Sequence, residues 1–376
     1  MFGGRPRDSC LVSTLFTMPS HDKETQWSFL VSGKRSFLSN DENDLHLKKM
    51  YKLTTDSTSQ GGDDDGSSSD SGTGTGTLIP GMNKDDSLSC LIRCSRADYC
   101  SIASVNRSLR SLIRSGEIYR LRRLQGTLEH WVYFSCHLNE WEAFDPRSKR
   151  WMHLPSMPQN ECFSYGEIAV LAGGCDSSGR ILDTAEMYNY EDQTWSVLPG
   201  MNKRRKMCSG VFMDGKFYVI GGIGVGEANE PKVLTCGEEF DLKTRKWTEI
   251  PEMSPPRSNQ GNGMSAAAMA PPLVAVVNDQ LYAADHAGMA VRRYDKVNRV
   301  WNQVGNLPEQ AGSMNGWGLA FRACGDQVIV IGGPRAPGEG FIELNSWVPS
   351  NATPEWHLLG KKQSVNFVYN CAVMSC

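Results

Sequence analysis

The segments FDPRSKRWMHLPSM (144–157), YNYEDQTWSVLPGM (188–201) and FDLKTRKWTEIPEM (240–253) share one pattern, and YDKVNRVWNQVGNLP (294–308) follows most of it. In each segment a tryptophan comes seven residues after the phenylalanine or tyrosine that opens it. Successive tryptophans are 44, 52 and 54 residues apart. A period of roughly 50 residues is typical of a β-propeller, because one such unit cannot bury its own faces and must stack on its neighbours.

A second pattern lies upstream of most of these tryptophans: an apolar run that ends in two glycines, as in IAVLAGG (168–174), FYVIGG (217–222) and VIVIGG (328–333). Paired glycines fit a strand end where φ is positive or another backbone approaches closely. A two-residue turn such as Asp214-Gly215 precedes each run and predicts a hairpin. One unit is therefore expected to be a four-stranded blade that buries its tryptophan against a neighbour. The residues assigned to this framework are Gly173, Gly174, Trp195, Gly221, Gly222, Trp247, Trp301, Gly332 and Gly333.

These features resemble kelch repeats, and the whole chain is similar to the F-box/kelch-repeat proteins of plants. The resemblance covers residues 131–376. It implies a mainly β fold, with a kelch-type β-propeller over residues 125–376. We count about five repeats, the fifth irregular around Trp347 and Trp356. An ordinary β-sandwich that contains Gly-Gly and tryptophan is the alternative.

The two ends of this region predict how the ring closes. The first repeat begins at 131–136 without the preceding strand that other repeats have, and the chain ends in a strand, 364–374, that no repeat follows. We expect this C-terminal strand to complete the first blade. Ile168 follows Met157 by only 11 residues, against 16 and 28 residues at the two later junctions. A missing repeat near residues 160–166 is our hypothesis for this short spacing.

Residues 1–77 are predicted to be a disordered, low-complexity region. The segment QGGDDDGSSSDSGTGTGT (60–77) has almost no apolar side chain, so burial cannot offset the entropy lost on ordering. A solvated spacer and a regulated, phosphorylated arm are both open interpretations of this region.

Residues 78–124 change to a helical period. Leu88, Leu91 and Ile92 fall at i, i+3 and i+4, and Ser95 opens a capping-box pattern. The segment resembles an F-box and is expected to form a small all-α domain; a helical cap on the propeller is the alternative.

The F-box resemblance implies docking on the Skp-family adaptor subunit of a cullin-based ubiquitin ligase. A domain of about 45 residues is too small to bury all of its apolar side chains, which suggests burial against a partner. The predicted docking residues are Ile79, Pro80, Leu88, Leu91, Ile92 and Leu109.

The densest basic run outside the helical segment is Lys203, Arg204, Arg205 and Lys206. Charge runs usually face water, so a solvated loop between blades is one interpretation. Contact with an acidic patch on a client protein and a nuclear-import signal are the others. These four residues are our candidate client contacts.

The composition argues against several other classes of function. A net charge of -3 creates no global field for nucleic acid or an anionic membrane surface, and the longest apolar stretch, 266–277, is too short to span a membrane. The histidines are scattered over different repeats, unlike the ligands of a kelch-fold copper oxidase, and no Ser-His-Asp order or Walker loop is present. We predict no catalytic, metal-binding or cofactor-binding residue, no cofactor and no enzyme activity.

By resemblance, the protein is expected to be the substrate-recognition subunit of a cullin-type E3 ubiquitin ligase. The F-box would dock the adaptor, and the propeller would bind a client protein, of unknown identity, for ubiquitination and proteasomal degradation. Its contribution would be proximity, because holding the client raises the effective concentration of its lysines. The alternative is a kelch interaction scaffold without a ligase. We expect the protein in the nucleus and cytoplasm.

Overall fold

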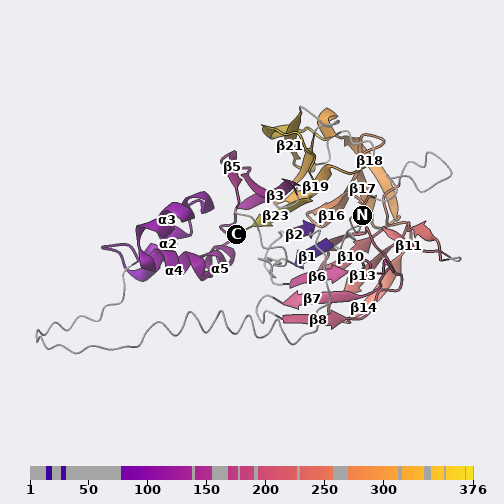
Figure 1. The fold of residues 1–376 in the computed structure, drawn as a ribbon, viewed down its shortest axis with the longest axis horizontal. Helices are drawn as coiled ribbons and strands as arrows, with labels where there is room; N and C mark the ends of the chain where they lie inside the picture. The colour runs from indigo at the N-terminus through magenta and orange to yellow at the C-terminus, as the bar shows by residue number, and fades with distance from the viewer. Residues whose placement is uncertain are drawn as a thin grey trace, which may run out of the picture. The chain divides into compact units, whose positions relative to one another are not determined.

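The computed structural model describes residues 14–18, 27–30, 78–137, 140–154, 168–176, 178–189, 194–226, 229–256, 270–311, 316–333, 340–350, 353–368 and 370–375. The chain divides into two compact units: residues 35–127, and residues 1–34 together with 128–376. In Figure 1 the first unit is helical, and the second is built from strands. Each unit is described by itself below.

The helical unit begins with α2 (Lys84–Leu91), which Asn83 caps by accepting a hydrogen bond from the backbone N–H of Asp86 at 2.7 Å. Asp86 and its neighbour Asp85 lie in the first turn, where negative charge interacts favourably with the helix dipole. Ser95 caps the next turn, as the sequence pattern predicts. The remaining elements are η1 (Arg96–Asp98), α3 (Tyr99–Val105), α4 (Arg107–Arg114) and α5 (Glu117–Leu124).

This unit has its own apolar core. Its buried members are Leu78, Leu91, Ile92, Tyr99, Leu109, Leu112 and Ile118. The guanidinium of Arg122 is also buried, and it donates hydrogen bonds to the carbonyl oxygens of Ile92 (3.0 Å) and Cys94 (2.6 Å). These carbonyls lie just after the end of α2, where helix hydrogen bonds run out, so Arg122 satisfies groups that burial would otherwise leave costly.

Three sheets of the second unit are four-stranded and antiparallel, as the repeat predicts. They contain β9 (Ser209–Met213), β10 (Lys216–Ile220), β13 (Gly237–Asp241) and β14 (Lys246–Ile250); β15 (Val274–Val277), β16 (Gln280–Asp285), β17 (Ala290–Asp295) and β18 (Val300–Asn306); and β19 (Leu319–Cys324), β20 (Gln327–Gly332), β21 (Phe341–Trp347) and β22 (His357–Gln363). The first strands of neighbouring blades contact one another, so they form the inner wall of the ring. A short hairpin, β11 (Ile223–Val225) with β12 (Pro231–Val233), follows β10, and η2 (Glu309–Ala311) follows β18.

The remaining strands form one sheet in the order β5-β4-β3-β23-β2-β1-β6-β7-β8. They are β1 (Thr14–Met18), β2 (Trp27–Leu30), β3 (His130–His137), β4 (Glu140–Asp145), β5 (Arg150–His153), β6 (Ile168–Ala172), β7 (Ala185–Asn189), β8 (Thr194–Leu198) and β23 (Asn370–Ser375). This sheet comprises two blades joined through β1 and β2, so the protein is a five-bladed β-propeller.

The C-terminal strand completes the first blade, which confirms the predicted closure: β23 pairs with β3 over six residue pairs, from Asn370 opposite Ser135 to Ser375 opposite His130. The N-terminal segment differs from prediction. Two of its stretches form strands, and β1 pairs with β6. Residues 1–13, 19–26 and 31–77, also predicted to be disordered, lie outside the described residues, as do residues 160–166, where we placed a missing repeat.

The aromatic–tryptophan pattern forms the outer hairpin of each blade. Phe240 and Trp247 are directly opposite each other on β13 and β14, with ring centroids 4.9 Å apart. The indole N–H of Trp247 then donates a hydrogen bond to the carbonyl oxygen of Pro199 in the preceding blade, at 2.7 Å. The indoles of Trp301 and Trp356 bond preceding-blade carbonyls in the same way. The seven-residue spacing therefore places each indole where it joins two blades. These indoles are only partly buried, and Trp195 is 39% exposed, which differs from the prediction of buried tryptophans.

The glycine pairs have the backbone requirement that the sequence predicts at two of three corners. Gly173 and Gly174 have φ of 72° and 106°, and Gly221 and Gly222 have φ of 62° and 93°. Gly332 ends β20 and is not among the positive-φ residues; its neighbour Gly333 lies against the backbone of Phe367.

Apolar cores join neighbouring blades around the ring. Each of four described clusters draws side chains from two adjacent blades, for example Phe212 and Phe217 on one side of a junction with Val170 and Leu198 on the other. Among the described helices, none is long and apolar enough to cross a membrane.

Candidate functional site: the two ends of the propeller

The connections between blades define one end of the propeller. A Cβ added to Gly222 would lie 2.6 Å from the carbonyl oxygen of Lys206 in the connection entering that blade. One added to Gly221 would lie 2.6 Å from the hydroxyl of Ser254 in the connection leaving it. We call this end, where the glycine corners meet these connections, the Gly-Gly face. Because blade strands are antiparallel, turns such as 214–215 lie at the opposite end, which we call the turn face.

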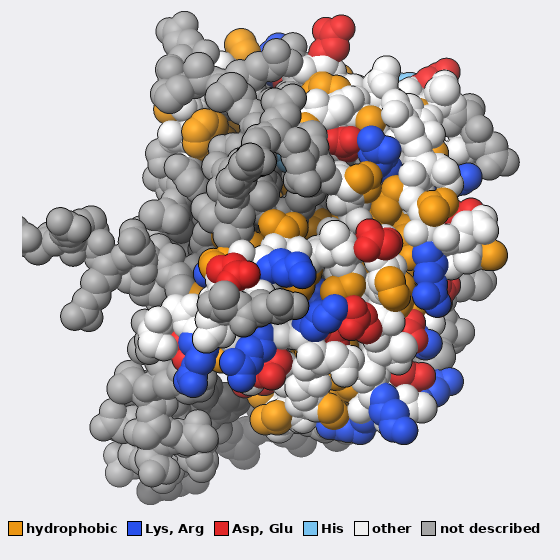
Figure 2. Space-filling model, turned by 90° about the vertical axis from the view of Figure 1, so that its right-hand side faces the viewer, with side chains coloured by type: hydrophobic (Ala, Val, Ile, Leu, Met, Phe, Trp, Pro, Cys, Tyr) orange, Lys and Arg blue, Asp and Glu red, His pale blue; other side chains and the backbone are white. Residues whose placement is uncertain are grey.

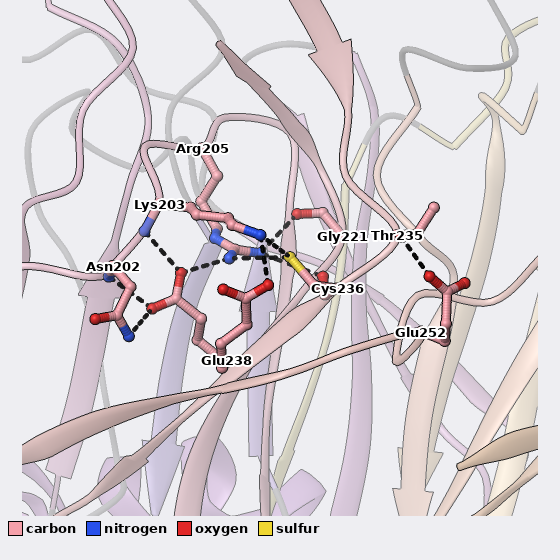
Figure 3. Close-up of polar contacts among 9 residues, drawn as sticks. Asn202, Lys203, Arg205, Gly221, Thr235, Cys236, Glu238 and Glu252 are labelled. Carbon is pink, nitrogen blue, oxygen red and sulfur yellow. Dashed lines mark hydrogen bonds and ion pairs between the residues drawn. The ribbon is translucent and has the colours of Figure 1, made fainter. Parts of the chain in front are cut away.

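The basic run at 203–206 lies in the connection between β8 and β9, on the Gly-Gly face. Figure 3 shows Asn202, Lys203 and Arg205 converging on the carboxylate of Glu238 in β13. The backbone N–H groups of Asn202 and Lys203 donate to Glu238 at 2.7 and 3.0 Å, and the Arg205 guanidinium donates at 2.5 Å. The guanidinium also donates to the carbonyl oxygen of Gly221, at 3.0 Å.

Arg205 was predicted to contact a client, and this prediction is wrong. The side chains of Arg205 and Glu238 are both 0% exposed, so the guanidinium cannot reach a partner protein. Burying either charge alone would be costly, and here the ion pair and the surrounding N–H donors compensate both. The pair ties the connection between two blades to the sheet of the second.

The other three basic residues keep part of their surface. Lys203 pairs with Glu249, and this hydrogen bond raises the pKa of the Lys203 ammonium and lowers the pKa of the Glu249 carboxyl. The Arg204 side chain is 55% exposed and its Nε lies 3.8 Å from the Asp183 carboxylate, a loose pair. Lys206 is half-buried. Client contact by these three residues stays a prediction.

A second feature of the Gly-Gly face is aromatic. Trp317, Val365 and Phe367 expose large apolar side chains in the connections that precede β19 and β23. Phe367 lies beside both Gly318 and the glycine corner at Gly333, which places it on this face. Exposed aromatic side chains are enriched in protein–protein interfaces because they bury much area at little entropic cost.

Charges of both signs are distributed over the outside of the blades. Figure 2 shows Lys and Arg interspersed with Asp and Glu on one side of the molecule. Several are paired within a blade, including Lys216 with Glu239 at 2.9 Å and Arg292 with Asp285 at 2.8 Å. This side therefore has no single-sign field that would attract a highly charged partner.

The turn face has a cavity of about 530 Å³. It is lined by Leu128, Glu129, His130, Asp145, Pro146, Arg147, Asn278, Cys324, Gly325, Asp326, Gln327 and Leu359. Burial lowers the pKa of His130 to about 4, although the Asp326 carboxylate opposes this shift, so the imidazole is neutral at pH 7. Within the described part of the chain, no group of three or more His, Cys, Asp or Glu residues could hold a metal ion.

The six predicted docking residues of the helical unit fall into two groups. Leu91, Ile92 and Leu109 are at most 4% exposed, within the core of the unit. Their assignment as docking contacts is wrong, because apolar residues at helical spacing first serve to hold the helices together. Pro80 is exposed and Ile79 and Leu88 are half-buried, so these three remain candidates for adaptor contact.

Sequence reasoning missed Glu238, although a signal was present. A glutamate stands two residues before the aromatic residue in three repeats: Glu142 before Phe144, Glu186 before Tyr188 and Glu238 before Phe240. Side chains two residues apart on a strand point to the same face, so this recurrence predicts a shared role. Glu142 fits it, since it pairs with Lys362 of the neighbouring blade.

A family profile described as Kelch motif matches residues 162–202 and 204–254. The chain is 81% identical to the Arabidopsis thaliana protein named F-box/kelch-repeat protein At1g26930, over an alignment of 428 residues that covers all of both chains. It is 53% identical to F-box/kelch-repeat protein SKIP11 of the same plant, over 84% of this chain and 78% of that protein. Among solved structures, one described as "Structure of YjhT" matches 54% of this chain and 65% of that chain at 17% identity, with a TM-score of 0.38, which supports no argument.

Proposed function

Because this chain belongs to the F-box/kelch-repeat protein family, we propose that it is the substrate-recognition subunit of a Skp–cullin–F-box ubiquitin ligase. The helical unit docks the Skp-family adaptor, and the propeller holds a client protein for ubiquitination and degradation. The protein itself does no bond chemistry; it raises the effective concentration of client lysines near the ligase.

One observation carries the proposal: a helical unit with its own core is joined in sequence to a propeller whose connections expose aromatic and charged side chains. The helical unit keeps apolar surface at its start, in Ile79, Pro80 and Leu88. A unit this small gains stability when such residues are buried against a partner.

Co-purification with the adaptor tests the first half of the proposal. Leu88→Asp and Pro80→Asp should each reduce recovery of the adaptor, because an aspartate would be desolvated at the interface. Leu124→Asp, at a side chain that is 71% exposed and outside the proposed docking set, is the matched control. Substituting Leu91 or Ile92 is not informative, because a charge in the core unfolds the unit. An unchanged adaptor recovery in both docking variants, with folding intact, would contradict docking through this surface.

The second half concerns the client, which we place on the Gly-Gly face. Arg204 contributes an exposed charge there, and Trp317 and Phe367 contribute apolar area. Affinity capture in proteasome-inhibited cells should recover a client with the intact protein, and Arg204→Glu or Trp317→Ala should reduce that recovery.

Arg299→Glu is the control for the charge change, because Arg299 is exposed in the turn between β17 and β18 at the turn face. Loss of the client with Arg299→Glu but not with Arg204→Glu would move the binding site to the opposite end. Client capture without any adaptor would identify an interaction scaffold rather than a ligase subunit.

We also place the protein in both nucleus and cytoplasm. Arg204 and Lys206 are the members of the basic run to test as an import signal, because Arg205 is buried. A fluorescent fusion carrying Arg204→Ala and Lys206→Ala should shift toward the cytoplasm; an unchanged distribution would rule out import through this run.

A further inference from the structure

The blade formed by β6, β7 and β8 does not obtain its inner strand from its own repeat. Gly173-Gly174 follows β6 as Gly221-Gly222 follows β10, so β6 corresponds to the second strand of the other blades. The inner position beside β6 is filled by β1, from the N-terminal segment. Residues 154–167, which join β5 to β6, form the shortest of the connections that reach a second strand.

The pairing of β1 with β6 is continuous. Leu15, Phe16, Thr17 and Met18 are opposite Leu171, Val170, Ala169 and Ile168. On its other side β1 pairs with β2 over four residue pairs, and β2 reaches β23 at a single pair, Ser28 with Val373. Both strands also contact β9, and β2 contacts β19, so the hairpin lies among the inner strands of the ring. Figure 1 shows β1 and β2 between β6 and β23.

The comparison with a relative points to the same place in the architecture. The alignment with F-box/kelch-repeat protein At1g26930 extends over 428 residues, whereas this chain has 376. The alignment must therefore contain positions at which the relative has residues and this chain has none. A ring built from fewer residues has a gap to close, and β1 and β2 lie where two blades would otherwise present open edges.

We propose that the gap between β6 and β23 is a strand-accepting site, occupied here by residues 14–30 of the same chain and able to bind the same extended peptide supplied in trans. Without this segment, β6 and β23 would each expose a row of backbone N–H and C=O groups, and such edges bind extended peptides by adding strands. The stretches TLFTM (14–18) and WSFL (27–30) are rich in residues that favour strands. The proposal concerns the isolated protein and does not depend on ligase function.

Hydrogen exchange of a truncated protein is the first test. Removal of residues 1–34 should increase amide exchange in β6 and β23 at least tenfold, because the ladder partner is lost. Removal of residues 36–69, an equally long segment that contains neither strand, is the matched control and should leave both strands protected. Equal exchange in the two truncated proteins would overturn the proposal.

Binding in trans is the second test. A fluorescent peptide of residues 12–32 should bind saturably to the protein lacking residues 1–34 and restore protection of β6. It should bind the full chain at least tenfold more weakly, because the tethered segment competes at high effective concentration. A peptide carrying Phe16→Pro and Thr17→Pro, which removes one ladder N–H on each side of the strand, should not bind. Equal binding by the full and truncated proteins, or equal binding of the proline peptide, would overturn the proposal.

A cysteine pair tests the register in the full chain, in case the truncated protein fails to fold. Thr17→Cys with Ala169→Cys places two thiols on directly opposite residues, within disulfide reach. Thr17→Cys with Leu171→Cys is offset by two residues and serves as the control. Peptide mapping by mass spectrometry should show the in-register disulfide at least fivefold more often; equal yields would contradict the pairing.

Discussion

Two junctions of the propeller are built differently. Between the β6–β8 blade and the β9–β14 blade, side chains make the seal: an apolar core, the buried pair of Arg205 with Glu238, and the indole of Trp247 on a carbonyl of the preceding blade. Between the β6–β8 blade and the blade that contains β23, the backbone ladders of β1 and β2 make the connection. The first junction uses residues from adjacent repeats, and the second requires a segment more than 100 residues away in sequence.

The difference separates specificity from closure. A buried ion pair with directed hydrogen bonds fixes one arrangement of two neighbouring blades, because any other arrangement leaves a charge desolvated. A strand ladder is less selective, since backbone groups are the same in every residue and register depends on the alternation of side chains. The first kind of junction can be repeated around a ring, whereas the second can bridge an irregular gap.

The largest effect should come from removing the strand that closes the ring. Deletion of residues 365–376 removes β23, which pairs with β3 over six residue pairs and buries Cys371, Ala372 and Val373. The cooperative thermal unfolding of the propeller should be lost. Deletion of residues 1–34 should lower the melting temperature but keep a cooperative transition, because β2 meets β23 at one pair only. An unchanged melting curve after the C-terminal deletion would contradict this closure.

The next largest effect should come from Glu238→Ala, which leaves the buried Arg205 guanidinium without its carboxylate. Breaking a buried ion pair from one side costs roughly 3–5 kcal/mol in free energy of unfolding. Urea unfolding of the propeller measures this cost. The double variant Arg205→Met with Glu238→Leu should be less destabilised than Glu238→Ala, because neither charge is then buried. If the double variant is instead the less stable one, the pair contributes more than compensation of two charges.

A smaller effect should come from Trp247→Phe, which keeps the aromatic contact with Phe240 but removes the indole N–H that bonds the Pro199 carbonyl. The net loss should be about 1 kcal/mol, typical of one hydrogen bond. Trp301→Phe, at the next junction, removes a longer bond to the Met253 carbonyl, at 3.2 Å, and should cost no more. Urea unfolding of both variants measures the two losses. No loss in either variant would show that packing alone holds these junctions.

The last effect is absent at neutral pH and appears only in acid. Burial lowers the pKa of His130 to about 4 in the folded state, from about 6.5 when unfolded, so the unfolded chain binds the extra proton between these values. The stability that His130 contributes is present above pH 6.5 and is lost as the pH falls toward 4. The melting temperature of His130→Gln should therefore fall less steeply than that of the natural protein over this range. Parallel curves would contradict the lowered pKa.

Much of the fold could be predicted from residues that recur. The aromatic–tryptophan pairs, the glycine corners and the two-residue turns are local features, and each has one backbone geometry that satisfies it. The closure by β23 was predictable because a terminal strand without a repeat must pair somewhere. The candidate sites were less predictable. Arg205 stands in a basic run and Leu91 in a small helical domain, where contact with a partner was expected, yet both side chains are buried.

The sequence by itself determined the repeat, the four-stranded blade and the separate helical segment, because these depend on spacing along the chain and on local backbone geometry. Only the tertiary structure decided which charges are buried, which apolar residues of the helical unit remain at its surface, and which strand fills the inner position beside β6. Those outcomes depend on contacts between segments far apart in the chain, such as Thr17 with Ala169 and Arg205 with Glu238, and no local pattern specifies which distant partner a buried charge or an open strand edge will find.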